Sequence, residues 1–325
     1  MSQIPLHWSR RALLGLLAAT ALSTAQAQQW PDRPVRFIVP FAAGSGTDIV
    51  ARLVGQKLSE AIKQPVIVEN RVGASGAIAA AAVARATPDG YTVFIATQTT
   101  QASNAGMFKK LPYEPIKDFE PVTMLGTIPL ILVVHPAVPA RTVAELQAHM
   151  RANPGKLSIG YGTGGAQVTA ELFKTQSKSD VLLVPYKSNP LALQAVIAGE
   201  IQMMVIDPGP SLPLIEAGRV RALAVTTAKR TPIAPQLPTM IEAGMAGYEL
   251  SAWYAALLPA GTPAAVRDRL NAELVKVMAL PEVRQQLGSA GIDAMSSTPA
   301  QLARFLETEL ERWSTHIRNA GMIPE

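Results

Sequence analysis

The chain has 325 residues, of which 48% are hydrophobic and 16% are charged, and its formal net charge is +5. This length suggests about two domains of ~150 residues and permits a sizeable core, which argues against a disordered chain. The absence of cysteine excludes thiol catalysis, disulfides, iron–sulfur clusters and cysteine-ligated zinc. The four histidines are scattered, and the small positive charge is dispersed, so neither a metal site nor a nucleic-acid surface is indicated.

Residues 1–27 have the pattern of a secretory signal peptide. Arg10 and Arg11 form a positive region, residues 12–22 are uncharged and apolar, and Ala25-Gln26-Ala27 is a small-x-small cleavage site. The apolar stretch is too short to span ~30 Å of hydrocarbon at ~1.5 Å per residue, which argues against an uncleaved anchor. The paired arginines leave a twin-arginine route open beside ordinary secretion. We therefore expect an exported, soluble protein.

The segment after the signal peptide alternates short apolar runs with helical patterns. This alternation is typical of α/β units with largely parallel sheets. In order, we expect a strand at 35–40, a helix at 47–62, a strand at 65–69, a helix at 77–86 and a strand at 91–96. In the first of these helices, the spacing places Ile49, Leu53, Leu58 and Ile62 on one side, which we expect to be buried.

A second series of the same kind begins near Pro129. It predicts strands at 130–134, 157–159, 181–184, 202–206 and 220–225, and helices at 143–151, 165–176 and 191–198. The tail differs, because 263–278 and 302–318 read as amphipathic helices that dock on their own domain. No long low-complexity linker and no internal repeat is present, so we expect domains joined by a hinge rather than by a flexible tether.

Two glycine-rich turns of similar design stand between a strand and a helix, at 41–48 (FAAGSGTD) and 160–166 (GYGTGGA). Glycine lets the backbone approach a bound atom closely, and the following helix begins with unpaired N–H groups at its positive end. Ser45, Thr47 and Thr163 add hydroxyl donors, so each turn is a candidate anion site. Since open α/β sheets bind ligands at the carboxyl ends of their strands, one turn per half predicts a ligand held between two lobes.

Other interpretations of these turns remain open. Either one could be a plain strand–helix connection, and Asp48 could cap its helix rather than contact a ligand. The second turn matches G-x-G-x-x-G at Gly160, Gly162 and Gly165. A dinucleotide site needs an acidic residue at the end of the next strand, whereas Asp180 lies at its start. The pattern therefore argues against a dinucleotide-binding enzyme.

No assembled catalytic group is evident in the sequence. The patterns G-x-S-x-G, H-E-x-x-H, H-x-E…C-x-x-C and the P-loop are all missing. Close carboxylate pairs such as Glu309 and Glu311 fall on different faces of a helix, and we expect them in solvent. We therefore expect no enzymatic activity, no metal and no cofactor. A secreted α/β hydrolase with an unrecognised site is the alternative.

A series of motifs runs in order through essentially the whole mature chain. They are Trp30-Pro31, Arg33-Pro34-Val35-Arg36, Val39-Pro40-Phe41, the turn at 44–48, Glu69-Asn70-Arg71 with Gly73 and Gly76, residues 88–92 (PDGYT), residues 110–113 (KLPY) with Asp118-Phe119, residues 184–187 (VPYK), residues 218–226 (GRVRALAVT) and residues 259–263 (PAGTP). Through these motifs the sequence resembles the Bug family of periplasmic solute-binding proteins, the extracytoplasmic receptors of tripartite tricarboxylate transporters.

The resemblance implies an α/β, two-lobed Venus-flytrap fold, type II-like, in which each lobe is a mixed sheet flanked by helices. It implies a signal peptide over 1–27, a first lobe made of 28–128 and 253–325, and a second lobe made of 129–252. It further implies a periplasmic, monomeric receptor that passes a small di-, tri- or aromatic carboxylic acid to membrane transporter subunits and binds no nucleic acid. A ligand sensor for a membrane kinase is the alternative.

The resemblance also assigns ligand-binding residues. It places carboxylate-binding loops at both glycine-rich turns, the segment from Thr97 to Asn104 facing the cleft, and Asp207 near an amino group, a hydroxyl group or a water molecule. The full set is Phe41, Gly44, Ser45, Gly46, Thr47, Asp48, Thr97, Gln98, Thr99, Asn104, Tyr161, Gly162, Thr163, Gly164, Gly165 and Asp207.

Some site positions depart from the family pattern. Ser45 stands where the family usually has Gly, and Gln101 stands where it often has His. Tyr161 and Gly165 replace the outer residues of the second turn. Tyr161 has three open interpretations, because it could narrow the pocket, stack on a flat acid or belong to the core. The departures keep the anion-binding chemistry of the backbone but leave the identity of the acid open.

Overall fold

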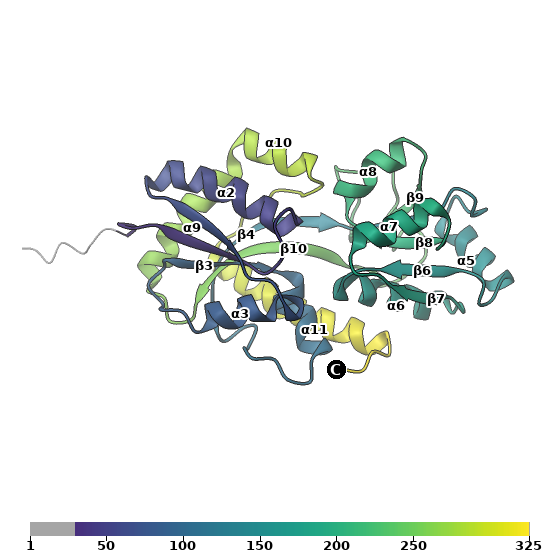
Figure 1. Ribbon diagram of the computed structural model, residues 1–325, viewed down its shortest axis with the longest axis horizontal. Coiled ribbons are helices and arrows are strands. Elements are labelled where there is room, and N and C mark those ends of the chain that lie inside the picture. Colours follow the sequence, from purple (N-terminus) through teal and green to yellow (C-terminus); the bar gives the residue numbers. More distant parts are fainter. Residues whose placement is uncertain (1–29, 325) are drawn as a thin grey trace, which may run out of the picture.

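The computed structural model describes residues 30–324, which form two lobes (Figure 1). Each lobe is built on a five-stranded sheet, with strand order β2-β1-β3-β10-β4 in the first lobe and β7-β6-β8-β5-β9 in the second. The predicted signal peptide at 1–27 lies outside the described residues. Within the described range, no helix has both the length and the apolar character needed to cross a membrane.

In the first lobe, β1, β2 and β3 are parallel, and β10 runs antiparallel between β3 and β4. The strands are β1 (Val35–Val39), β2 (Val66–Asn70), β3 (Thr92–Thr97), β4 (Phe119–Pro129) and β10 (Ser251–Pro259). The helices are α2 (Gly46–Ile62), α3 (Ala77–Ala84), α4 (Asn104–Met107), α9 (Ala264–Ala279), α10 (Pro281–Ser289) and α11 (Pro299–Asn319), with the short turns η1 (Ala74–Gly76) and η2 (Thr99–Ser103). Helices α2 and α9 lie on one side of the sheet, and α3 and α11 lie on the other (Figure 1).

The second lobe repeats this plan, because β6, β7 and β8 are parallel and β5 runs antiparallel between β8 and β9. The strands are β5 (Ile131–Val134), β6 (Ser158–Tyr161), β7 (Leu182–Pro185), β8 (Met203–Ile206) and β9 (Arg221–Val225). The helices are α5 (Val143–Ala152), α6 (Gly164–Ser177), α7 (Asn189–Ala198) and α8 (Pro208–Glu216).

The apolar pattern predicts largely parallel sheets, and in each sheet all strands but one run in the same direction. The one reversed strand makes both sheets mixed, as the family resemblance implies. The antiparallel members are β10 and β5, which lie where the chain passes between the lobes. The pattern also misses β4, whose run is interrupted by Pro121 and Pro129. Proline is tolerated there because β4 is an edge strand, where a missing backbone donor breaks fewer ladder bonds.

The buried face of α2 matches the prediction at Leu58 and Ile62 but differs from it at the start of the helix. Ile49 was expected on that face but is 42% exposed, whereas Val50 and Val54 are fully buried together with Leu58. Residues four apart lie on one side of a helix, so the row through 50, 54 and 58 defines the side that packs on the sheet. The spacing of large apolar residues favoured Ile49 over Val50, although Val50 is the buried residue of the two.

Helix α11 has the predicted apolar side, on which Leu302, Leu306 and Trp313 are buried. Glu309, however, was expected in solvent and is only 2% exposed. Its carboxylate accepts hydrogen bonds from the indole N–H groups of Trp253 and Trp313. A buried carboxylate needs such donors, and the helical pattern alone does not reveal them because Trp253 comes from β10.

Two chain crossings join the lobes, one from β4 into β5 through Leu130 and one from β9 back to β10. Thr226 connects both crossings and is fully buried. Its N–H donates to the Leu130 carbonyl at 2.9 Å, and the Leu130 N–H donates to its hydroxyl at 3.2 Å. Leu250 N–H donates to the Thr226 carbonyl at 3.0 Å, and the Thr226 hydroxyl donates to the Leu250 carbonyl. The two crossings are therefore tied together at a single residue.

The lobes also touch where the end of α10 meets the start of α8. A Cβ atom on Gly291 would lie 2.7 Å from the Gly209 nitrogen and 2.8 Å from the Pro208 Cβ. A Cβ on Gly209 would lie 2.8 Å from the Ala290 carbonyl oxygen. These distances are shorter than van der Waals contact, so glycine permits the close approach of the lobes here.

We predict that Gly291→Ala separates the lobes, whereas Gly321→Ala does not. Both glycines have left-handed backbone, with φ of +76° and +69°, so each alanine variant loses about 1–2 kcal/mol of stability to strain. At Gly321 nothing lies within 4 Å of the added Cβ, whereas at Gly291 it meets the opposite lobe. Calorimetry should show the larger loss of melting temperature for Gly291→Ala, and small-angle scattering a larger radius of gyration. Indistinguishable variants would contradict this contact.

Candidate ligand-binding site

The two glycine-rich turns follow β1 and β6 and lead directly into α2 and α6. The two helices begin in the same way. The Ser45 hydroxyl oxygen accepts from the Asp48 N–H at 3.3 Å, and the Thr163 hydroxyl oxygen accepts from the Ala166 N–H at 3.2 Å. Each side chain therefore caps its helix by binding the third N–H of the first turn.

Capping leaves the first two N–H groups of each helix without an acceptor in the described part of the chain. They belong to Gly46 and Thr47 in α2, and to Gly164 and Gly165 in α6. The start of a helix carries a partial positive charge, and its free N–H groups point outward along the axis. Each lobe thus presents a site that suits an anion such as a carboxylate.

Asp48 shapes the first turn from within. One carboxylate oxygen accepts from the Gly44 N–H and the Arg52 Nε, each at 2.9 Å, and the other accepts from the Asn70 Nδ2 at 2.9 Å. Asn70 also donates to the Phe41 carbonyl oxygen at 2.9 Å. Burial would raise the pKa of Asp48, but these hydrogen bonds outweigh it and hold the pKa below its usual value. Ligand contact by Asp48 and Phe41 stays a prediction.

Tyr254 on β10 lies behind the first turn and was not singled out by the sequence. Tyr254 is 7% exposed. A Cβ on Gly46 would collide with its hydroxyl, so the backbone of the turn rests directly on Tyr254. Burial raises the pKa of Tyr254, and the charge of Asp207 in the second lobe raises it further. The first turn and Asp207 therefore lie within electrostatic reach of one tyrosine.

The second turn is held by Asn189, the first residue of α7. The Asn189 side-chain oxygen accepts from the Gly162 N–H at 2.9 Å, and the same side chain hydrogen-bonds to the Asp207 carboxylate. A Cβ on Gly162 would overlap the backbone of Ser188 and Asn189. Gly162 thus provides close packing, and its donor is used inside the lobe. Tyr161, at the end of β6, is half-buried.

Two side chains of the first lobe reach the second turn. A Cβ on Gly165 would lie 3.2 Å from the Gln98 Oε1, and a Cβ on Gly164 would lie 2.9 Å from the Met107 Cε. Gln98 is 4% exposed, and its Nε2 has no hydrogen-bond partner among residues 30–324. An unpaired buried donor costs about 1–3 kcal/mol, so this amide lacks an acceptor at the point where the lobes meet.

The predicted segment from Thr97 to Asn104 is divided by the structure. Gln98 faces the second lobe, as described above. Thr97 hydrogen-bonds to Thr100 within its own turn, and the fully buried Asn104 donates to the Ser75 carbonyl at 3.0 Å. Thr97 and Asn104 therefore form these hydrogen bonds inside the first lobe. Thr99 lies between them in the chain and is half-buried.

Asp207 is half-buried at the N-terminus of α8, where its side chain makes no capping bond. Burial raises the pKa of Asp207, and the hydrogen bond from Asn189 offsets only part of this effect. Across residues 30–324, no three His, Cys, Asp or Glu side chains come together in a way that could hold a metal ion.

These observations define a class of protein. Two lobes are joined by crossing strands, each presents the N-terminus of a helix with two free N–H groups, and a buried amide of one lobe lies against the turn of the other. Such an arrangement is that of a two-lobed solute-binding protein.

Comparison with known proteins identifies the family. Residues 50–322 match the family model described as "Tripartite tricarboxylate transporter family receptor". The chain belongs to this family of solute-binding receptors. The resemblance to Bug proteins is confirmed, and the alternative of a secreted hydrolase is wrong, because the family is not an enzyme family.

Three relatives illustrate the likeness. Protein BugT of Bordetella pertussis is 30% identical over 95% of this chain and 97% of its own length. The structure of R. palustris Rpa4515 with adipate has a TM-score of 0.82 and 36% identity, covering 91% of this chain and 100% of that one. MatC from Rhodopseudomonas palustris with bound malate has a TM-score of 0.76 and 31% identity, covering 89% of this chain and 100% of that one.

We predict opposite pH-dependent effects on stability from neutralising Asp207 and Asp48. The pKa of Asp207 is raised above 3.8, so its charged form costs stability at neutral pH, and that cost disappears as Asp207 gains its proton in acid. Asp207→Asn should therefore raise the melting temperature near pH 7, with a gain that shrinks toward pH 3.8.

Asp48→Asn serves as the counterpart. Because the pKa of Asp48 is lowered, its charged form stabilises the protein above pH 3.8, and this contribution is lost as the pH falls through the lowered pKa. Asp48→Asn should lower the melting temperature near pH 7. Thermal melts between about pH 2 and pH 8 measure both effects. A lower melting temperature for both variants at neutral pH would refute the assignment for Asp207.

Proposed function

We propose that this chain captures a small organic carboxylate between its two lobes and delivers it to a tripartite tricarboxylate-type transporter in the membrane. The observation that carries the proposal is the matched pair of helix N-termini, with free N–H groups at Gly46 and Thr47 in one lobe and at Gly164 and Gly165 in the other. Family membership supports delivery to a transporter. The relatives solved with adipate and malate support a dicarboxylic acid as the ligand.

The chemistry of recognition follows from the donors. A carboxylate accepts charge-assisted hydrogen bonds from backbone N–H groups, and these strengthen when closure of the lobes removes water. Two such ends suit an acid with two carboxylates, one for each helix. The unpaired Nε2 of Gln98 adds a neutral donor beside the second turn. In this proposal Asp207 contacts a hydroxyl or amino group of the ligand, or a water molecule.

The surrounding cations do not replace these donors. Arg52, in the second turn of α2, gives its Nε to Asp48 and another guanidinium nitrogen to Asn70 at 3.2 Å. It therefore stabilises the turn. Recognition by neutral backbone donors permits several acids of similar length to bind, which fits the two different acids named for the relatives.

The proposal also covers the lobe boundaries, the oligomeric state and the location of the protein. We take the first lobe as 28–128 with 253–325, and the second as 129–252, with the crossings at Leu130 and Leu250 near their borders. The mature receptor acts as a monomer in the periplasm after removal of the signal peptide near Ala27.

Titration calorimetry against adipate, malate, citrate and benzoate, with glucose as a neutral control, tests the ligand class. Binding of glucose and of none of the acids would overturn the proposal.

A sharper prediction concerns a single N–H group. Gly164→Pro should weaken binding of the preferred acid about 10- to 100-fold, because it removes a donor to a charged group worth about 1.5–3 kcal/mol. Proline is tolerated at the first position of a helix. Proline also requires an extended backbone at the residue before it, and Thr163 already has φ of −145° and ψ of 160°.

Gly164→Ala is the matched control, because it adds the same Cβ beside Met107 and keeps the N–H. Calorimetry should show near wild-type affinity for Gly164→Ala and the loss for Gly164→Pro, with circular dichroism checking that both fold. Equal affinities of the two variants would show that this N–H does not bind the ligand.

A further inference from the structure

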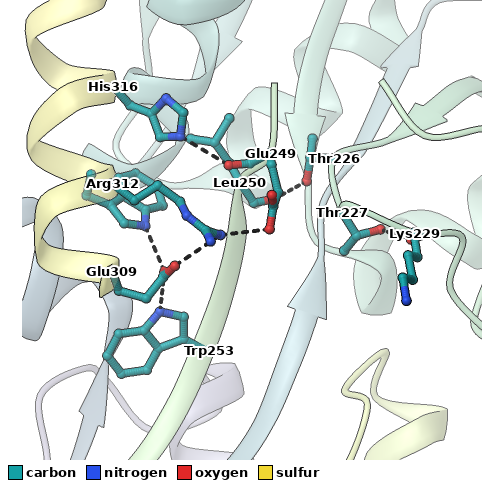
Figure 2. A network of polar contacts seen from close by, with 10 residues as sticks. Thr226, Thr227, Lys229, Glu249, Leu250, Trp253, Glu309, Arg312 and His316 are labelled. Atoms are coloured by element: carbon teal, nitrogen blue, oxygen red, sulfur yellow. Dashed lines mark hydrogen bonds and ion pairs between the residues drawn. The ribbon is translucent and has the colours of Figure 1, made fainter. Parts of the chain in front are cut away.

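A buried carboxylate joins the C-terminal helix α11 to the strand that returns to the first lobe (Figure 2). Glu309 accepts from the Trp253 indole on β10 at 2.8 Å and from the Trp313 indole on α11 at 3.2 Å. Its other oxygen lies 3.2 Å from the Arg312 guanidinium. The Glu309 side chain is only 2% exposed, so these hydrogen bonds fix its position, and its ion pair fixes the Arg312 guanidinium beside it.

Arg312 extends this network to Glu249, just before β10. The Arg312 guanidinium lies 2.7 Å from the Glu249 carboxylate, and the His316 Nε2 lies 3.1 Å from the Glu249 carbonyl oxygen (Figure 2). Glu249 belongs to neither sheet, since β9 ends at Val225 and β10 begins at Ser251. Two side chains of α11 therefore fix both the side chain and the backbone of a residue in the crossing segment.

The residue before Glu249 is fixed to the other lobe. Tyr248 is fully buried, and its hydroxyl donates to the Thr169 carbonyl oxygen of α6 at 2.7 Å. Its ring also packs edge-to-face on Phe173 of α6, with ring centroids 6.4 Å apart. Helix α6 is the helix whose first turn carries the free N–H groups of the second lobe. Neighbouring residues of one chain are thus anchored to opposite lobes.

We infer that the lobes turn about the chain between Tyr248 and Glu249, and that Arg312 is the positioning residue that holds the first-lobe side of this hinge. Anchors on both sides of one peptide concentrate the rotation there, while Thr226 ties Leu250 to Leu130 in the other crossing. The contacts of Arg312 with Glu249 and of Tyr248 with α6 connect α11 to the second lobe, so α11 determines the angle between the lobes when no ligand is bound. The inference rests on the proposed function in one respect, since closure around a ligand is the motion that this hinge serves.

The test compares Arg312→Met with Arg269→Met. Arg269 on α9 is a matched control, because it also pairs with a buried glutamate of its own helix, Glu273, at 3.1 Å, but it lies away from the crossings. The chain contains no cysteine, so spin labels at Gln56→Cys on α2 and Ala148→Cys on α5 report the distance between the lobes. Both positions are exposed.

Without any ligand, Arg312→Met should shift or broaden the distance distribution measured by double electron–electron resonance, and Arg269→Met should leave it unchanged. Tyr248→Phe, which removes the bond to α6 alone, should broaden it as well. Arg312→Lys, which keeps the charge, should restore most of the wild-type distribution. A wild-type distribution in both Arg312→Met and Tyr248→Phe would overturn the inference.

Binding provides the second readout. A looser hinge populates the closed arrangement less, so Arg312→Met should weaken binding of the acid identified by calorimetry by about three- to tenfold, and Arg269→Met should not. An equal loss of affinity in both variants would point to general destabilisation and would contradict the inference. If the wild-type protein binds no acid, the proposed function fails, whereas the ligand-free distance measurement still decides the hinge.

Discussion

Unpaired N–H groups at the start of two helices are the constraint on which the rest of this molecule depends. Each helix begins with groups that have no partner within it, and the capping hydroxyls of Ser45 and Thr163 bind only the third of them. The first two in each helix remain available. Contacts with Gln98 and Met107 of the first lobe place the start of α6 where the lobes meet. In the function that we propose, one anion bridges the two helix N-termini. A solute-binding receptor follows from the family to which the chain belongs, and a carboxylate is the ligand that we propose for it.

The side chains around the two helix N-termini fix the backbone of the glycine-rich turns and do not supply positive charge for an anion. Asp48 and Asn70 bind the backbone of the first turn, and Asn189 binds that of the second. Tyr254 supports the first turn from behind and leaves room for a glycine alone. Rigid turns lose little entropy when a ligand binds, so the hydrogen bonds of the N–H groups contribute more fully to affinity.

Movement and recognition are linked through α6. Its first turn carries two N–H groups without an acceptor among residues 30–324, and its later residue Thr169 binds Tyr248 beside the crossing. A shift of α6 on binding is therefore transmitted to the peptide before Glu249, which α11 holds from the other side. If the anion binds at the first turn of α6, as we propose, the same helix acts on the hinge, which gives a physical route from binding to closure.

The sequence by itself determined the local parts of this protein, the two glycine-rich turns and the helices they begin, because turn formation depends on residues within four positions of one another. The structure decided that Ser45 and Thr163, expected as hydroxyl donors to an anion, cap their helices. The order of family motifs also determined the two-lobed class. Only the tertiary structure decided that Tyr254 lies behind Gly46, that Asn189 takes the donor of Gly162, and that Glu309 is buried between two tryptophans. Each of these contacts joins segments far apart in the chain, and their geometry arises from how sheets and helices pack, which no periodicity in the sequence records.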